Sequence, residues 1–299
     1  MTDLWVHAKK IDSFSDHAYG GNPAGVVATE GPLADDQMQR MAREMNLSET
    51  VFVAPDAVGE ADVRLRYFTP TVEVPICGHA TIAALHHLHD EGPERDAWRL
   101  STRVGVLAGR IEGDVAWTGF DRTEVLGVWP EDPAALLQAL GAADVLAAGA
   151  RPVLFHDRNL AIEVRDAAAL DALRPDLDAL DRLVRQDLDG VIVFTQGGTA
   201  SGITWHQRYF APGYGIPEDP VTGLAAARTA ALLARLGRFA PGADGMVRAA
   251  VRQGDALGRP GRIEVRLRLG DDGAVASTEI GGRAVTTMTG RMRLPAPAH

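Results

Sequence analysis

Cysteine is nearly absent from this chain, because Cys77 is the single cysteine among 299 residues. One cysteine excludes an internal disulfide and any zinc site built from several cysteines. No apolar run approaches the roughly 18 residues that a membrane span needs, and the first residues, MTDLWVHAKK, lack the apolar centre of a signal peptide. The formal net charge of −10 argues against nucleic acid and anionic membranes as partners. We therefore expect a cytoplasmic enzyme or binding protein.

The motifs that usually indicate a cofactor are missing as well. The chain contains no Gly-x-x-x-x-Gly-Lys phosphate loop, no Gly-x-Gly-x-x-Gly opening a helix and no Gly-x-Ser-x-Gly elbow. His86, His87 and His89 are expected to lack acidic or cysteine partners at metal-ligand spacing. The sequence therefore predicts neither a cofactor nor a metal site.

Two stretches of the chain repeat each other. RYFTPTVEVPIC at 66–77 and RYFAPGYGIPED at 208–219 each precede a helix-forming segment, and their arginines are 208 − 66 = 142 residues apart. The same shift relates these pairs: Phe68 and Phe210, Pro70 and Pro212, Pro75 and Pro217, Cys77 and Asp219. Self-similarity at a fixed spacing indicates duplicated structural units. In a two-lobed enzyme, equivalent positions such as 77 and 219 can face each other across a cleft.

The pattern of apolar residues predicts an α+β fold of two pseudo-symmetric lobes, each a curled, mostly antiparallel sheet around a central helix. The length suits about two domains. In each half, many short strands surround one long helix, at 79–89 and at 222–236. We expect an N-terminal lobe at 1–127, completed by a last strand at about 286–299, and a C-terminal lobe at 128–285.

Short polar residues indicate where loops lie and helices begin. The glycine-rich segment 19–25 is predicted to be a loop, and Asp35 is placed to cap a helix at 35–47. Prolines on both sides of Asp219 stop any earlier helix, so Thr222 is the expected cap of the second long helix. Asp219 then precedes a helix N-terminus, where backbone amides and the helix dipole favour negative charge.

Four residues could carry chemistry, and each also has a purely structural interpretation. Glu49 precedes an apolar strand, so it either faces solvent or points into a cleft, where burial would raise its pKa. His79 opens the first long helix and is either a surface cap or a neutral imidazole suited to acid/base work. Asp219 could be only an acidic turn residue. Asn22, in a Gly-Gly-Asn-Pro segment, belongs to a tight turn or faces a ligand.

Six motifs, spread over about residues 11–290, carry a joint resemblance to one family. They are GGNPAGVV, LSETVFV, RYFTPTVEVPICGHAT, GIPEDPVTG, QGDALGRPGRIEV and IGGRAV. Together they resemble the PhzF-like phenazine-biosynthesis isomerase family, whose fold is that of diaminopimelate epimerase. The resemblance implies two lobes of that fold, an active site between them, no cofactor and a homodimer. The family's catalytic residues match Glu49 of the SET motif, His79 of CGHAT and Asp219 of EDP-x-TG.

The function that this resemblance implies is cofactor-independent isomerisation of a small carboxylic acid. Glu49 would move a proton between carbons, while His79 and Asp219 would orient and polarise the substrate. The substrate carboxylate would bind at the starts of the two long helices. Substrate contacts are expected from the following residues: Asn22, Ser48, Cys77, Gly78, Gly223 and Leu224. Two alternatives stay open: a racemase or epimerase of an amino or hydroxy acid, and a catalytically silent protein that binds small acids.

The chain departs from the family pattern at two places. Pro75 and Ile76 stand before CGHAT, where the family usually has an acidic residue, and Leu224 stands where the phenazine enzyme has a serine. The single cysteine also removes the two-thiol mechanism of the epimerase relatives. The chemistry that remains centres on carboxylates and His79.

We predict weak or no turnover of the phenazine precursor, because the Leu224 side chain cannot form the hydrogen bond that a serine would make to a polar ring substituent. Leu224→Ser should raise the rate. The measurement is turnover of that precursor by both proteins. A wild-type rate as high as that of a true phenazine isomerase would show that position 224 does not select the substrate.

Overall fold

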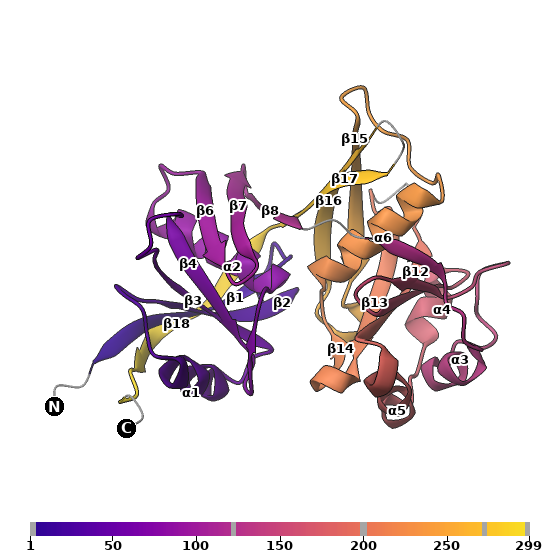
Figure 1. Ribbon diagram of the computed structural model, residues 1–299, viewed down its shortest axis with the longest axis horizontal. Coiled ribbons are helices and arrows are strands. Elements are labelled where there is room, and N and C mark those ends of the chain that lie inside the picture. The colour runs from indigo at the N-terminus through magenta and orange to yellow at the C-terminus, as the bar shows by residue number, and fades with distance from the viewer. Residues whose placement is uncertain (1–3, 121–123, 198–201, 271–273, 297–299) are drawn as a thin grey trace. The chain divides into compact units, whose positions relative to one another are not determined.

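The chain forms two compact units, which are described separately here. The computed structural model describes residues 4–120, 124–197, 202–270 and 274–296. Unit 1 comprises Met1–Gly119 together with Gly281–His299, and unit 2 comprises Phe120–Ile280 (Figure 1). The expected boundaries followed residues 127 and 285, so each observed boundary lies a few residues earlier in the chain.

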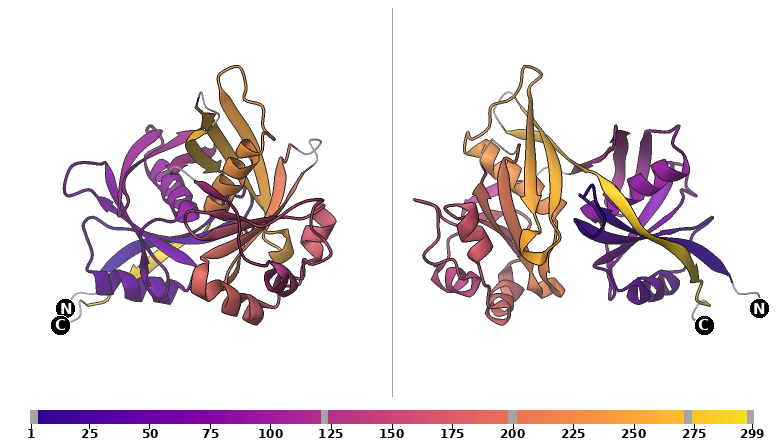
Figure 2. Two further views of the ribbon diagram at one scale, coloured as in Figure 1. Left: turned by 45° about the vertical axis from the view of Figure 1, so that its right-hand side comes forward. Right: turned by 180° about the vertical axis from the view of Figure 1, so that it is seen from behind.

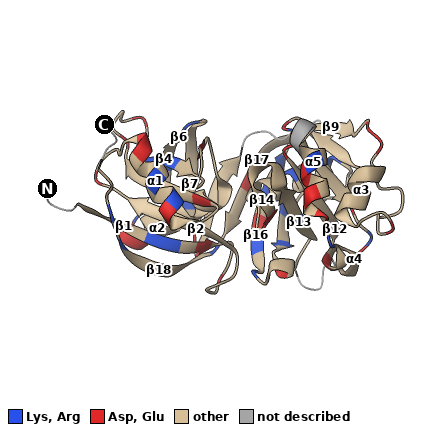
Figure 3. Cartoon of the chain, turned by 90° about the horizontal axis from the view of Figure 1, so that it is seen from below, with Lys and Arg blue, Asp and Glu red and all other residues tan. Residues whose placement is uncertain are grey.

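Unit 1 is a curled sheet with two helices. Its strands are β1 (Trp5–Ser13), β2 (Asn22–Ala28), β3 (Glu49–Pro55), β4 (Val63–Phe68), β5 (Glu73–Val74), β6 (Ala97–Thr102), β7 (Gly105–Glu112), β8 (Val115–Phe120) and β18 (Ala284–Arg293). Its helices are α1 (Asp35–Met45) and α2 (Gly78–Glu91). Acidic residues lie in the first turn of α1 and Arg43 in its last, which suits the helix dipole (Figure 3).

Unit 2 repeats this arrangement with more helices. Its strands are β9 (Val125–Val128), β10 (Val153–Phe155), β11 (Asn159–Glu163), β12 (Gly190–Gln196), β13 (Trp205–Ala211), β14 (Ile216–Asp219), β15 (Met246–Gln253), β16 (Gly261–Leu269) and β17 (Val275–Gly282). Its α-helices are α3 (Ala134–Leu140), α4 (Ala167–Ala172), α5 (Leu177–Asp187) and α6 (Gly223–Arg235).

The two units share one succession of strand pairings. From β18 in unit 1, the neighbours are β1, β2, β3, β4 and β6, and only the β2–β3 and β4–β6 pairs of this run are parallel. From β9 in unit 2, the neighbours are β10, β11, β12, β13 and β15, and the equivalent third and fifth pairs of the run, β11–β12 and β13–β15, are again the parallel ones. A short antiparallel strand, β5 or β14, pairs with β4 or β13 just before the central helix. The α+β class and the pseudo-symmetric lobes are thereby confirmed.

Each central helix is buried along most of its length. Figure 2 shows two further views of the chain. In α2, six successive residues from Ala80 to Leu85 are at most 1% exposed, and the helix contacts β1, β2, β3, β7 and β18. In α6, Ala225, Ala226 and Ala227 are fully buried. Small side chains allow strands to approach a helix from several directions, so the alanine-rich sequences explain why these two helices occupy the centres of their units.

Several local expectations were wrong. Asn22 and Pro23 belong to β2 instead of a loop, with Pro23 near the strand end where its missing N–H is tolerated. Asp35 is the first helical residue, and the cap of α1 is Ala34, whose N–H is bonded by Gln37. Thr222 is the cap residue of α6 but makes no capping bond.

An arginine clamps the strand that precedes the central helix in both units. Arg66 donates from Nε and Nη2 to the two carboxylate oxygens of Glu73, both at 2.7 Å. Arg208 makes the same paired bonds to Glu218, both at 2.8 Å. Each guanidinium also lies over the phenylalanine two residues on, 5.2 and 5.1 Å from the ring centre. We call these pairs the arginine clamps. The arginines and the phenylalanines are 142 residues apart, whereas the glutamates are 218 − 73 = 145 apart, because the loop before Glu218 is three residues longer.

We predict that Arg208→Met lowers the free energy of unfolding by about 3–5 kcal/mol, because it leaves Glu218 without its counter-ion. It also removes the donor to the backbone oxygens of Leu170 and Leu173. The matched control is Arg252→Met. The Arg252–Asp255 pair is 46% and 35% exposed, so its loss should cost less than about 1 kcal/mol. Chemical denaturation measures both, and equal losses would contradict a structural role for the clamp.

Candidate active site

Unit 1 brings together five of the residues that the sequence nominated. Asn22 and Glu49 are the first residues of β2 and β3, which run parallel as neighbours with Ala24 opposite Glu49. Cys77 is the N-cap residue of α2 and His79 its second residue. Strand starts and a helix start therefore converge, and Ser48 lies beside Glu49 in the chain.

His79 lies at the centre of this cluster. Its Nδ1 is 3.3 Å from Asn22 Nδ2 and 3.3 Å from Cys77 Sγ. Its Nε2 is 3.5 Å from Ser48 Oγ and 3.5 Å from Glu49 Oε2. The backbone oxygen of His79 accepts a bond of 2.7 Å from Ser13 Oγ. The imidazole is only 6% exposed, so its orientation is fixed from both sides.

The partners of His79 define its tautomer. An amide nitrogen can only donate, so in this arrangement Nδ1 accepts from Asn22 and carries no proton in the neutral ring. The imidazole proton then belongs on Nε2, which faces Ser48 and Glu49. At 3.5 Å these two contacts are long for hydrogen bonds. The Nε2 proton is therefore available to a substrate atom that comes closer.

Glu49 is largely buried, which argues against a solvent-facing side chain. Its side chain is 12% exposed. Burial disfavours the charged form and raises the pKa of Glu49, while hydrogen bonds with Ser48 and Cys77 act in the opposite direction. A carboxyl with a raised pKa can both accept and return a proton near neutral pH. Glu49 thus has the properties of a general acid/base group.

Two groups of side chains bear on metal binding. The ligand atoms of Glu49, Cys77 and His79 lie within 4.8 Å of one another and could hold a metal ion. The expectation that the histidines at the end of α2 lack acidic partners was wrong. His86 lies 3.6 Å from Asp90, and His87 lies 3.9 Å from Glu91, at the i,i+4 spacing of one helix face.

The histidine–carboxylate pairs of α2 already have a cation beside them. Lys9 Nζ, from β1, lies 3.0 Å from Glu91 and 3.7 Å from Asp90. Burial, with Lys9 close by, lowers the pKa of His87 to about 4. Lys9 thus offsets part of the negative charge of these carboxylates, which fits a structural role at the helix end.

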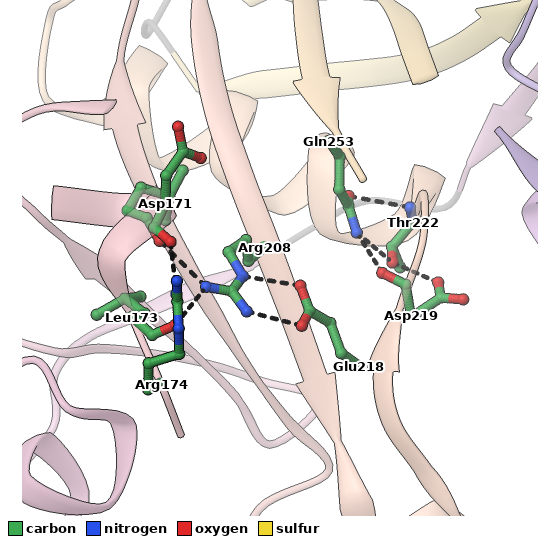
Figure 4. A network of polar contacts seen from close by, with 9 residues as sticks. Asp171, Leu173, Arg174, Arg208, Glu218, Asp219, Thr222 and Gln253 are labelled. Carbon is green, nitrogen blue, oxygen red and sulfur yellow. Dashed lines mark hydrogen bonds and ion pairs between the residues drawn. The ribbon is translucent and has the colours of Figure 1, made fainter. Parts of the chain in front are cut away.

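In unit 2, Asp219 is the last residue of β14 and is 8% exposed. Thr222 donates its hydroxyl proton to Asp219 Oδ2. Gln253 Nε2 donates to the Asp219 backbone oxygen at 2.8 Å, and Gln253 Oε1 accepts from the Thr222 N–H at 3.0 Å (Figure 4). Asp219 is thereby held in one orientation. Sequence reasoning missed Gln253, although it opens the QGDALG motif, because the partners of a buried amide are set by tertiary contacts.

The remaining nominated residues lie at the two helix starts. Gly78 is the first residue of α2, and Gly223 and Leu224 are the first two residues of α6. Gly223 is buried and Leu224 half-buried. Backbone N–H groups in the first turn of a helix lack partners within it, so both starts are suited to bind a carboxylate.

The fold agrees with comparisons to known proteins. The family model of phenazine biosynthesis-like proteins matches residues 11–290. The chain therefore belongs to this family, whose named relatives are isomerases. In the described ranges, every helix is too short or too polar to cross a membrane.

Three known proteins illustrate the similarity. The chain is 34% identical to an uncharacterized isomerase of Clostridium acetobutylicum, over 95% of this chain and 97% of the relative. It is also 34% identical to trans-2,3-dihydro-3-hydroxyanthranilate isomerase of Pseudomonas aeruginosa, over 95% and 98%. A crystal structure of a PhzF-family phenazine biosynthesis protein from Bacillus anthracis has the same fold, with a TM-score of 0.86 at 23% identity over 97% and 99% of the chains.

We predict that Glu49→Gln stabilises the protein at neutral pH. The pKa of Glu49 is raised in the folded state, so its contribution to stability is complete below the ordinary value of 4.5 and is lost as pH rises through the folded-state pKa. Each pKa unit of difference is worth about 1.4 kcal/mol. The thermal midpoint of Glu49→Gln should match wild type near pH 4 and exceed it at pH 8. Glu44→Gln, at an exposed position of α1, is the control, and an unchanged difference at both pH values would contradict burial of Glu49.

Proposed function

We propose that this protein is a cofactor-independent isomerase that moves a proton between two carbons of a small carboxylic acid. The observation that carries the proposal is the buried Glu49, with its raised pKa, beside His79 and Cys77. Membership in a family whose relatives are named isomerases supports the reaction class.

Glu49 is proposed as the group that takes and returns the proton. Burial makes its carboxylate more basic than a solvated one, and a substrate carboxylate nearby would raise the pKa further by like-charge repulsion. The same carboxyl can then deliver the proton to a second carbon of the substrate held against it. One group suffices for this transfer if the two carbons lie on one face of the substrate.

His79 and Asp219 are proposed to orient and polarise the substrate. The Nε2 proton of His79 points to the side where Glu49 lies, so it can bond a substrate oxygen that gains negative charge when the proton leaves carbon. The amides at the start of α2 are suited to the substrate carboxylate. Asp219, oriented by Thr222, supplies an acceptor for a polar substrate group.

Cys77 is proposed to shape the site and not to act as a base. Its thiol is 9% exposed and hydrogen-bonds with the Glu49 carboxyl, which stabilises the anionic form of Glu49 after proton release. An opposed-base epimerase would need Cys77 or a second carboxylate to take the proton on the other face of the substrate. The stereochemistry of exchange distinguishes the two reactions.

We predict that Glu49→Gln lowers the rate of substrate C–H exchange in heavy water by about a hundredfold to ten-thousandfold, the usual contribution of a general acid/base group. The glutamine keeps the size and hydrogen bonding of the side chain but cannot accept the proton. The probe is trans-2,3-dihydro-3-hydroxyanthranilate, the acid named for the Pseudomonas relative, tested in the Leu224→Ser background because only weak turnover is expected without that change. Linear and cyclic amino and hydroxy acids are then tested on the chain with Leu224. Mass spectrometry measures deuterium uptake.

Controls separate loss of chemistry from loss of binding. Glu44→Gln should exchange at the wild-type rate, and Glu49→Gln should keep its thermal shift with the same acid. Wild-type exchange by Glu49→Gln would remove Glu49 as the base. Deuterium at an inverted stereocentre would identify an epimerase, and binding of acids without any exchange by wild type would identify a silent binding protein.

A further inference from the structure

Gln253 has a central place in the hydrogen bonds around Asp219. It is the last residue of β15 and is 2% exposed. Its Oε1 accepts from the Thr222 N–H at 3.0 Å and from Gln207 Nε2 at 2.8 Å. Its Nε2 donates to the Asp219 backbone oxygen at 2.8 Å and to Thr222 Oγ1 at 3.1 Å. All four hydrogen-bonding positions of the amide are therefore engaged. Figure 4 shows the bonds of Gln253 to Asp219 and Thr222.

The direction of these bonds fixes the Thr222 hydroxyl. An amide nitrogen can only donate, so Thr222 Oγ1 accepts from Gln253. The hydroxyl must then direct its own proton elsewhere, and it donates to Asp219 Oδ2. Gln253 thereby sets the polarity of a chain of bonds that ends on the carboxylate. A hydroxyl bonded to a carboxylate forms a charge-assisted bond, which is about twice as strong as a neutral one.

Contacts with neighbouring residues also fix the orientation of Gln253. Trp205 Nε1 donates to Gln207 Oε1 at 2.9 Å, which turns the Gln207 amide so that its nitrogen faces Gln253. Gly254, the next residue, has φ +98°, and a Cβ there would lie 2.2 Å from Arg259 O and 2.9 Å from Pro220 O. The backbone after Gln253 thus packs directly against the loop that follows Asp219.

Unit 1 has an apolar residue in the place of Asp219. Val74 pairs with Tyr67 as Asp219 pairs with Tyr209, whereas Cys77 corresponds to Thr222, because each is the N-cap residue of its central helix. The expectation that Cys77 and Asp219 are equivalent positions was therefore wrong. A valine has no polar group to orient, whereas in unit 2 a side chain from a separate hairpin holds the segment around Asp219.

We propose that Gln253 is a positioning residue, which orients the Asp219 carboxylate for catalysis through the Thr222 hydroxyl. This inference rests on the proposed function, in which Asp219 orients the substrate. This role of Gln253 requires the N–H donor at Nε2. A side chain of the same size without that donor is not sufficient.

The test uses Gln253→Glu in the full-length protein. The new carboxylate keeps the shape and both acceptor contacts but loses the donor, so the Thr222 hydroxyl turns its proton toward it and away from Asp219. A crystal structure of the variant should show the Asp219 carboxylate rotated away from Thr222. An Asp219 side chain in its original position would overturn the inference without any need for a substrate.

Kinetics supply the second readout. Heavy-water exchange of trans-2,3-dihydro-3-hydroxyanthranilate is measured in the Leu224→Ser background, where the rate is expected to be higher. Gln253→Glu should lower kcat on the order of a hundredfold, the usual effect of a small misplacement, with KM nearly unchanged. In an Asp219→Asn background, Gln253→Glu should cause no further loss of kcat. An equal loss in both backgrounds would show that Gln253 does not act through Asp219.

A matched control isolates the loss of a buried amide. Gln37 is 6% exposed, accepts from the Ala34 N–H at 3.1 Å and donates to Pro295 O at 2.6 Å. Gln37→Glu should lower stability with no change in kcat. The two proposals fail separately. If Glu49→Gln exchanges at the wild-type rate, the proposed function is overturned. If Glu49→Gln loses exchange but the effects of Gln253→Glu and Asp219→Asn on kcat are additive, only the role of Gln253 is overturned.

Discussion

The arginine clamps are the constraint on which the rest of each unit depends. In each, a largely buried guanidinium binds both oxygens of one glutamate, so the short strand before the central helix is fixed to the strand beside it. A buried charge that loses its partner costs several kcal/mol, and the strand therefore cannot shift without breaking the fold. Cys77 at the start of α2, and Asp219 directly after Glu218 at the end of β14, are held in place with these strands. The geometry of the candidate site residues thus depends on two ion pairs outside the candidate site.

Much of the fold could be predicted from the sequence because the chain is duplicated. The long helices expected at 79–89 and 222–236 are found at 78–91 and 223–235. The strand β15 is harder to predict, because its sequence MVRAAVRQ does not alternate strictly and three successive residues, Ala249 to Val251, are buried. Such a strand has neighbours on both faces, and its apolar run cannot be distinguished from a short helix by periodicity.

The candidate site was less predictable than the fold. Sequence patterns left Glu49 equally suited to solvent and to an interior position, and only its neighbours in space resolve this. The resemblance nominated Glu49, His79 and Asp219, but it offered no role for Gln253. The orientation of a buried amide depends on which donors and acceptors tertiary packing brings near, and these come here from β13, α6 and the end of β14. No local pattern encodes such a network.

The pairing of the first strand with the last has a consequence for synthesis on the ribosome. β1 is joined along its whole length to β18, with Trp5 opposite Arg293 and Ser13 opposite Ala284. Residues of unit 2 are continuous in the chain, whereas unit 1 needs both ends. Domains generally fold as units while the chain emerges, so the second unit is complete first, and the first waits with one edge of its sheet uncovered until β18 has been synthesised. Demand for chaperones should therefore concentrate on unit 1.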